Sequence, residues 1–209
     1  MTLFSSSVWA CSEPWNKEKA ARNKPHHELT EYQKVPWYFD ETGAPSTLKG
    51  KTALVTGSSS GIGMGVATEL YRLGARVIVT SRSVPKAEVA CATIKKAVED
   101  MPKPGDNVGE LVPMSLSLDD LDSVKSFAKE FCSRFKKLEY LCENAGIAVQ
   151  DKKTPKPSKQ GYEICYASNF LGHALLMELL LPTLLASAPA RVSFTSSITH
   201  WGATPLSST

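Results

Sequence analysis

The stretch TALVTGSSSGIG, residues 52–63, decides the fold of this chain. Residues 52–56 are apolar or β-branched and predict a short strand. The glycines that follow allow a sharp turn, and their spacing is G-x-x-x-G-x-G. Such a turn presents backbone N–H groups at the start of a helix, where a pyrophosphate binds favourably. The stretch therefore predicts a strand, a phosphate-binding turn and a helix, although a tight turn without a ligand would show the same local pattern.

Beyond this unit, strand-like and helix-like segments alternate along the chain. Further strands are expected at 76–80, 110–114, 138–142 and 191–195. Helices are expected where apolar residues recur on one face: Ile62, Val66, Leu70 and Leu73; Ala87, Ala90, Ile94 and Ala97; Val124, Phe127, Ala128, Phe131 and Phe135; and the long apolar run 162–185. Asp119 or Asp120 is the expected N-cap of the third helix. This alternation predicts the α/β class, as a Rossmann-type doubly wound parallel sheet that ends after its fifth strand.

The first 48 residues differ in character from the rest. They contain three of the four tryptophans and the pair His26-His27, without a helical or strand period. We therefore expect an N-terminal arm of unknown role at 1–48 and a dinucleotide-binding domain at 49–209.

Composition excludes several classes of function. The net charge of +3 and the scattered lysines do not favour nucleic acid as a partner. Five cysteines without close pairing favour reduced thiols, no metal site and a cytoplasmic location, with organelle targeting by the arm left open. The apolar run 174–190 is interrupted by Glu178 and Pro182, so we expect a buried helix and no transmembrane segment.

Four motifs in order resemble the short-chain dehydrogenase/reductase family. They are the turn TGSSSGIG, Glu-Asn-Ala-Gly at 143–146, SNFLGH at 168–173 and RVSFTSS at 191–197. Together they cover residues 49 to about 200. The sequence of residues 161–185 is similar to that of the retinol-dehydrogenase-like branch of this family. The resemblance implies a nicotinamide-dependent oxidoreductase that interconverts a carbonyl and an alcohol on a small molecule.

The resemblance also implies roles for particular residues. Ser197 would orient the substrate carbonyl and Asn169 would position a relay water, although a turn cap and a buried structural amide are the alternatives. Two positions depart from the family pattern, because Glu143 replaces an asparagine and Ser115 replaces the aspartate that contacts adenine. The implied cofactor-binding residues are Thr56, Gly57, Ser59, Ser60, Gly61, Ile62, Gly63, Ser81, Arg82, Asn144, Ala145 and Gly146.

The end of the second predicted strand indicates which cofactor is preferred. It reads Thr80-Ser81-Arg82 and has no acidic residue to accept from a ribose 2′-hydroxyl. Arg82 can pair with a 2′-phosphate, so we expect NADP(H) to be preferred over NAD(H). An ordinary surface arginine is the alternative.

The family's tyrosine and lysine pair is missing from these 209 residues, which contain no Tyr-x-x-x-Lys. We therefore expect a chain that is incomplete at its C-terminal end and negligible turnover by this polypeptide; His200 is a weak substitute for the tyrosine. A non-catalytic NADP(H) sensor or scaffold is the main alternative, and a sugar-nucleotide epimerase a distant one. An uncovered apolar face at Leu175, Leu176, Leu179 and Leu180 suggests a homodimer.

Overall fold

The computed structural model describes residues 47–99, 101, 108–148 and 157–195. Within them, five parallel strands form one sheet in the order β3-β2-β1-β4-β5. Strand order reverses between β1 and β4, which is the switch point of a doubly wound sheet. The strands are β1 (Thr52–Val55), β2 (Arg76–Ser81), β3 (Glu110–Ser115), β4 (Tyr140–Glu143) and β5 (Arg191–Phe194). The predicted fold class is thereby confirmed.

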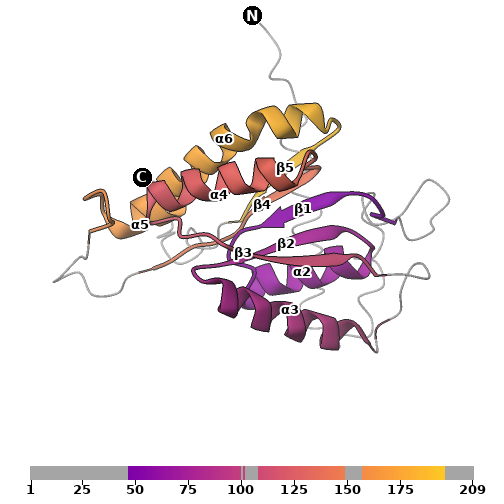
Figure 1. Ribbon diagram of the computed structural model, residues 1–209. Helices are drawn as coiled ribbons and strands as arrows, with labels where there is room; N and C mark the ends of the chain where they lie inside the picture. The colour runs from indigo at the N-terminus through magenta and orange to yellow at the C-terminus, as the bar shows by residue number, and fades with distance from the viewer. Residues whose placement is uncertain (1–46, 100, 102–107, 149–156, 196–209) are drawn as a thin grey trace, which may run out of the picture. The chain divides into compact units, whose positions relative to one another are not determined.

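Helices cover both faces of this sheet (Figure 1). One face carries α2 (Gly61–Arg72) and α3 (Val84–Glu99), and the other carries α4 (Leu121–Arg134) and α6 (Gly172–Ala186). On the α4 and α6 side, Leu54, Ile78 and Leu141 from the sheet are completely buried with Phe131 and Leu176. Each such side chain contributes roughly 1.5–3 kcal/mol to folding, so this layer is a main source of stability.

Two helices bury most of the residues expected and differ at one exposed residue each: Leu70 and Leu73, and Ala87, Ala90 and Ile94, are buried as predicted. In α2 the buried residues are Gly63, Ala67, Leu70 and Tyr71, while Ile62 is 66% exposed. In α3, Ala97 is exposed and its neighbour Val98 is buried. In α2, Gly63 is buried where a side chain would collide with the Gly57 carbonyl and the Asn144 amide. Ile62, at the start of α2, is therefore not part of the core.

The predicted long helix over 162–185 is divided into three parts. A short turn α5 (Ile164–Tyr166) leads into a π-helical turn η3 (Ala167–Leu171) and then into α6. By length and composition, Ile164–Ala186 could cross a membrane, a test that core helices also pass. Here Leu176 and Leu180 have no exposed surface and contact the sheet.

The burial of these two leucines corrects the expected uncovered face. Leu176 and Leu180 belong to the core rather than to an open surface. The exposed leucines of α6 are Leu179, Leu181 and Leu185, of which Leu185 is 68% exposed. Any partner surface on α6 therefore lies around these residues.

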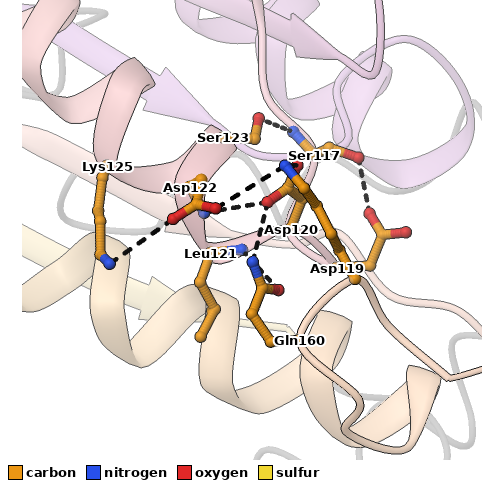
Figure 2. A network of polar contacts seen from close by, with 9 residues as sticks. Ser117, Asp119, Asp120, Leu121, Asp122, Ser123, Lys125 and Gln160 are labelled. Carbon is orange, nitrogen blue, oxygen red and sulfur yellow. Dashed lines mark hydrogen bonds and ion pairs between the residues drawn. The ribbon is translucent and has the colours of Figure 1, made fainter.

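A polar network fixes the start of α4 (Figure 2). Asp120 is the N-cap, and its Oδ1 accepts from the Asp122 N–H at 3.0 Å. The same side chain accepts from Gln160 and forms an ion pair with Lys159 at 2.9 Å. The Leu121 N–H donates to Gln160 Oε1 at 3.2 Å. These contacts attach the segment before α5 to the start of α4.

Candidate cofactor site

A cavity of about 650 Å³ opens at the carboxyl ends of β1, β2 and β4. This is the edge where open α/β sheets bind ligands, and the volume lies in the range of small-molecule sites. Ten of the predicted cofactor residues line it: Gly57, Ser59, Ser60, Ile62, Gly63, Ser81, Arg82, Asn144, Ala145 and Gly146. The exposed Ile62 thus contributes to the cavity wall and not to the core.

The glycine turn packs directly on the loop that follows β4. Gly57 has φ of +65°, a conformation that favours glycine. A side chain at Gly57 would collide with Ala145, and one at Gly63 would collide with the Gly57 carbonyl and the Asn144 amide. Glycine at both positions therefore lets the turn, the first helix and the β4 loop meet at one edge of the cavity.

Thr56 supports this edge from behind instead of lining it. Its side chain is completely buried, and its Oγ1 accepts from the backbone N–H groups of Asn144 and Ala145, both at 2.9 Å. The Asn144 side chain returns the contact, because its Nδ2 donates to the Thr56 carbonyl at 3.0 Å. Thr56 is thus placed to orient the loop and does not line the cavity.

Two cations line the other end of the cavity. Arg82 follows β2 and Lys86 lies in the first turn of α3; both are exposed. Among the described residues, no carboxylate forms an ion pair with either of them. Ser81 shapes the turn between them, since its Oγ donates to the Ser83 carbonyl at 2.6 Å. This end of the cavity is therefore suited to an anion.

The end of β3 contributes different residues from the one expected. Ser115 does not line the cavity; it is exposed, and its Oγ donates to the Arg82 carbonyl at 3.2 Å. Leu116, Leu118 and Asp119 line the cavity instead. The chain leaves the strand at Ser115, so the residues that reach the cavity come later in the sequence.

Of the two predicted catalytic residues, Asn169 and Ser197, only Asn169 lies within the described residues. Asn169 lies in the π-helical turn, and its side chain makes two hydrogen bonds of 2.8 Å with the backbone N–H and carbonyl of Ile147. It does not line the cavity, whereas Ile147 and Ser168 do. Ser197 and His200 lie outside the described residues. Gly61, a predicted cofactor residue with φ of +58°, is exposed within the turn 57–63 and does not line the cavity.

Glu143 is a buried carboxyl group at the carboxyl end of β4. It is 2% exposed, and neither side-chain oxygen has a hydrogen-bond partner among the described residues. Burial penalises the charged form and raises the pKa of Glu143 to about 7. Glu143 directly precedes the loop that lines the cavity. The charge next to this loop therefore depends on pH.

Several cavity residues were not expected from the sequence. Lys86, Ile147, Ile164 and Ser168 join the wall through the folding of α3, the β4 loop and the segment around α5. A signal existed for Lys86, which lies only four residues beyond Arg82, at the start of the helix that follows β2. The others depend on how distant segments meet.

The sheet order, the switch point and the glycine turn together define a dinucleotide-binding Rossmann domain. A family model described as short chain dehydrogenase matches residues 51–206. This chain belongs to the short-chain dehydrogenase family.

Relatives of known name agree with this membership. The chain is 42% identical over 161 residues to human retinol dehydrogenase 14, covering 74% of this chain and 47% of that protein. It is 38% identical to mouse retinol dehydrogenase 12, covering 73% of this chain and 45% of the relative. The predicted retinol-dehydrogenase-like branch is confirmed. The chain spans about half the length of these relatives.

A solved structure shows the same fold. A metagenomic short-chain oxidoreductase in complex with NADP is 29% identical, with a TM-score of 0.59 over 72% of this chain and 63% of that protein.

Proposed function

We propose that this chain binds NADP(H) in the cavity and belongs to an oxidoreductase that interconverts a carbonyl and an alcohol. The observation that supports the cofactor assignment is the pair Arg82 and Lys86 at one end of the cavity. Among the described residues, neither side chain forms an ion pair with a carboxylate. The names of the relatives, retinol dehydrogenases 14 and 12, make a retinoid the first substrate class to test.

The residues present fit this cofactor. The turn 57–63 offers backbone N–H groups to the pyrophosphate, and glycine at 57 and 63 keeps its edge free of side chains. Arg82 and Lys86 would hold the 2′-phosphate beside β2. Since the switch point divides the two halves of a dinucleotide, the nicotinamide half would lie over β4, beside the loop Asn144–Ile147.

When bound, the nicotinamide ring supplies or accepts the hydride. Asn169 and Ser197 are proposed to serve the reacting oxygen, as the family resemblance implies. Because the 209 residues contain no Tyr-x-x-x-Lys, we expect this polypeptide alone to bind cofactor with negligible turnover. A non-catalytic NADP(H) sensor or scaffold is the second candidate, because the cofactor cavity alone would serve it.

Two expectations about context accompany this function. Leu181 and Leu185, four residues apart on one side of α6, expose apolar surface, which supports a homodimer through that side of the helix. A cytoplasmic location stays a prediction from the cysteine content.

Titration of wild type and Arg82→Ala with NADP⁺ and NAD⁺ tests the cofactor assignment. Charge-assisted hydrogen bonds contribute roughly 1.5–3 kcal/mol, so the variant should bind NADP⁺ at least about tenfold more weakly. Its affinity for NAD⁺ should hardly change. Lys95→Ala removes a cation from α3 that lies outside the cavity and is the control. Equal NADP⁺ affinity in wild type and Arg82→Ala would refute the role of Arg82.

A further inference from the structure

The loop Asn144–Ile147 is held at two separate points. At its start, the buried hydroxyl of Thr56 accepts from the N–H groups of Asn144 and Ala145, both at 2.9 Å. At its end, the Asn169 side chain donates to the Ile147 carbonyl and accepts from the Ile147 N–H, both at 2.8 Å. The two supports come from opposite parts of the sequence, from the end of β1 and from the π-helical turn.

His173 joins these two supports. Its Nε2 lies 2.9 Å from Thr56 Oγ1, and its Nδ1 lies 3.2 Å from the Asn169 carbonyl oxygen. The imidazole is 5% exposed and does not line the cavity. A continuous path of hydrogen bonds therefore runs from the start of the loop, through Thr56, His173 and Asn169, to its end.

Counting donors and acceptors assigns the imidazole one tautomer. Thr56 Oγ1 already accepts two backbone N–H groups, which uses both of its lone pairs. Its own hydrogen is thus free to be donated, and His173 Nε2 at 2.9 Å is nearer than the Cys142 carbonyl at 3.4 Å. Nε2 must then be the acceptor, and Nδ1–H donates to the Asn169 carbonyl.

A neutral ring suits this arrangement. Burial lowers the pKa of His173, and its hydrogen bond to the Asn169 carbonyl opposes this only in part. The imidazole is therefore uncharged near neutral pH, as its acceptor role toward Thr56 requires.

We propose that His173 is a positioning residue that holds the loop Asn144–Ile147 in the conformation needed by the nicotinamide half of the cofactor. The proposal rests on the proposed function, because it assumes a dinucleotide in the cavity. His173 acts only through Thr56 and Asn169. Its loss should therefore weaken binding of the half of the cofactor beside this loop and leave the adenosine half bound.

The test compares two ligands, NADP⁺ and adenosine 2′,5′-bisphosphate, by titration calorimetry on the full 209-residue chain. In His173→Leu we expect NADP⁺ to bind about tenfold more weakly, whereas the bisphosphate, which lacks the nicotinamide half, changes less than about twofold. His173→Gln, which again offers Thr56 an acceptor, should recover most of the lost affinity. Leu176→Val on the same helix controls for a general loss of packing and should leave the ratio of the two affinities unchanged.

Thr56→Val and Thr56→Ser keep the proposal testable if His173→Leu does not fold. Valine removes the hydroxyl and should reproduce the selective loss, while serine should behave like wild type. Where His173→Leu folds, adding it to Thr56→Val should cost less than about twofold more than Thr56→Val alone, because the two residues act in one path.

A spectroscopic measurement tests the path without any cofactor. In ¹⁵N spectra of histidine-labelled protein, the His173 signals, assigned by their loss in His173→Gln, should show a neutral ring with its proton on Nδ1. Amide exchange at Ala145 and Ile147 should accelerate in the histidine variants.

The outcomes separate the two claims. Equal weakening of both ligands in a folded His173→Leu, or no change in either, would overturn the role of His173. Failure of wild type to bind either ligand would contradict the proposed function instead. The tautomer of His173 and the amide exchange would then test the hydrogen-bond path. An Nε2-protonated ring, or amide exchange that is unchanged in the histidine variants, would overturn the path.

Discussion

A β-carbon placed on Gly57 would lie 2.9 Å from the Cα atom of Ala145. That separation is shorter than real β-carbon contacts, and Gly57 also has φ of +65°. The turn after β1 and the loop after β4 are thus in contact through a position where only glycine fits. The cavity depends on this contact, because both segments line it.

Gly57→Ala should therefore weaken NADP⁺ binding by more than about tenfold and destabilise the fold by roughly 1–3 kcal/mol, through strain and a displaced loop. Gly65→Ala is the matched control: Gly65 lies within α2 and has open space where its β-carbon would be. It should stabilise the helix by up to about 1 kcal/mol and leave binding intact. Urea unfolding and calorimetric titration measure both effects, and equal behaviour of the two variants would contradict the close contact.

The buried carboxyl group of Glu143 should make stability depend on pH. Its pKa is about 7 in the folded chain and 4.5 in the reference state, so the unfolded chain releases its proton first. The contribution to stability is complete below pH 4.5 and is lost as the pH rises toward 7, by up to about 3 kcal/mol at 1.36 kcal/mol per pH unit.

Glu143→Gln removes this titration at nearly constant shape. The difference in unfolding free energy between wild type and variant, measured in urea from pH 4.5 to 8, should shift steadily in favour of the variant. A difference that stays constant over this range would show that the carboxyl group is not buried without a partner.

The cap of α4 should lose its effect in acid. The ion pair with Lys159 holds the pKa of Asp120 down at about 2, against 3.8 in the reference state. Its contribution to stability is therefore present above pH 3.8 and is lost as the pH falls toward 2. Asp120→Ala should cost about 1 kcal/mol near neutral pH, and Asp120→Asn, which can still cap, less. Asp122→Asn is the control from the same network. If thermal unfolding showed a larger loss of stability for Asp122→Asn than for Asp120→Ala, the assignment of Asp120 as the N-cap would be contradicted.

Turnover by the 209-residue polypeptide should be negligible. Loss of a general acid/base typically costs ~10²–10⁴-fold in rate, and these residues contain no Tyr-x-x-x-Lys. An NADPH-oxidation assay with retinal, steroid and aliphatic carbonyl substrates checks this, with human retinol dehydrogenase 14 as a positive control. Turnover comparable to that enzyme would show that another residue performs proton transfer, and His200 would be the first to replace.

The strands and the glycine turn could be predicted because their signals are local. Runs such as residues 76–80 are short, apolar and bounded by turn residues, so their period and ends are visible in the sequence. The buried face of α2 could not be predicted in the same way. Hydrophobicity favoured Ile62 for the core, but Ile62 lines the cavity. Gly63 is buried instead, where a side chain would collide with the Gly57 carbonyl and the Asn144 amide.

The site was predictable where it follows a motif and not where it depends on contacts between distant segments. Gly57, Arg82 and Asn144, which are predicted to bind the cofactor, line the cavity. Thr56 belongs to the same motif but is buried, because its hydroxyl serves backbone groups some ninety residues later in the chain. The π-helical turn that contains Asn169 and precedes His173 leaves no periodic signal in an apolar run.

The most direct test of the account is a calorimetric titration of the purified 209-residue chain with NADP⁺ and, separately, with NAD⁺. We predict binding to one site per chain, with NADP⁺ at least about tenfold tighter than NAD⁺, because Arg82 and Lys86 line the cavity where the 2′-phosphate would lie. Binding of neither nucleotide, or tighter binding of NAD⁺, would contradict the account.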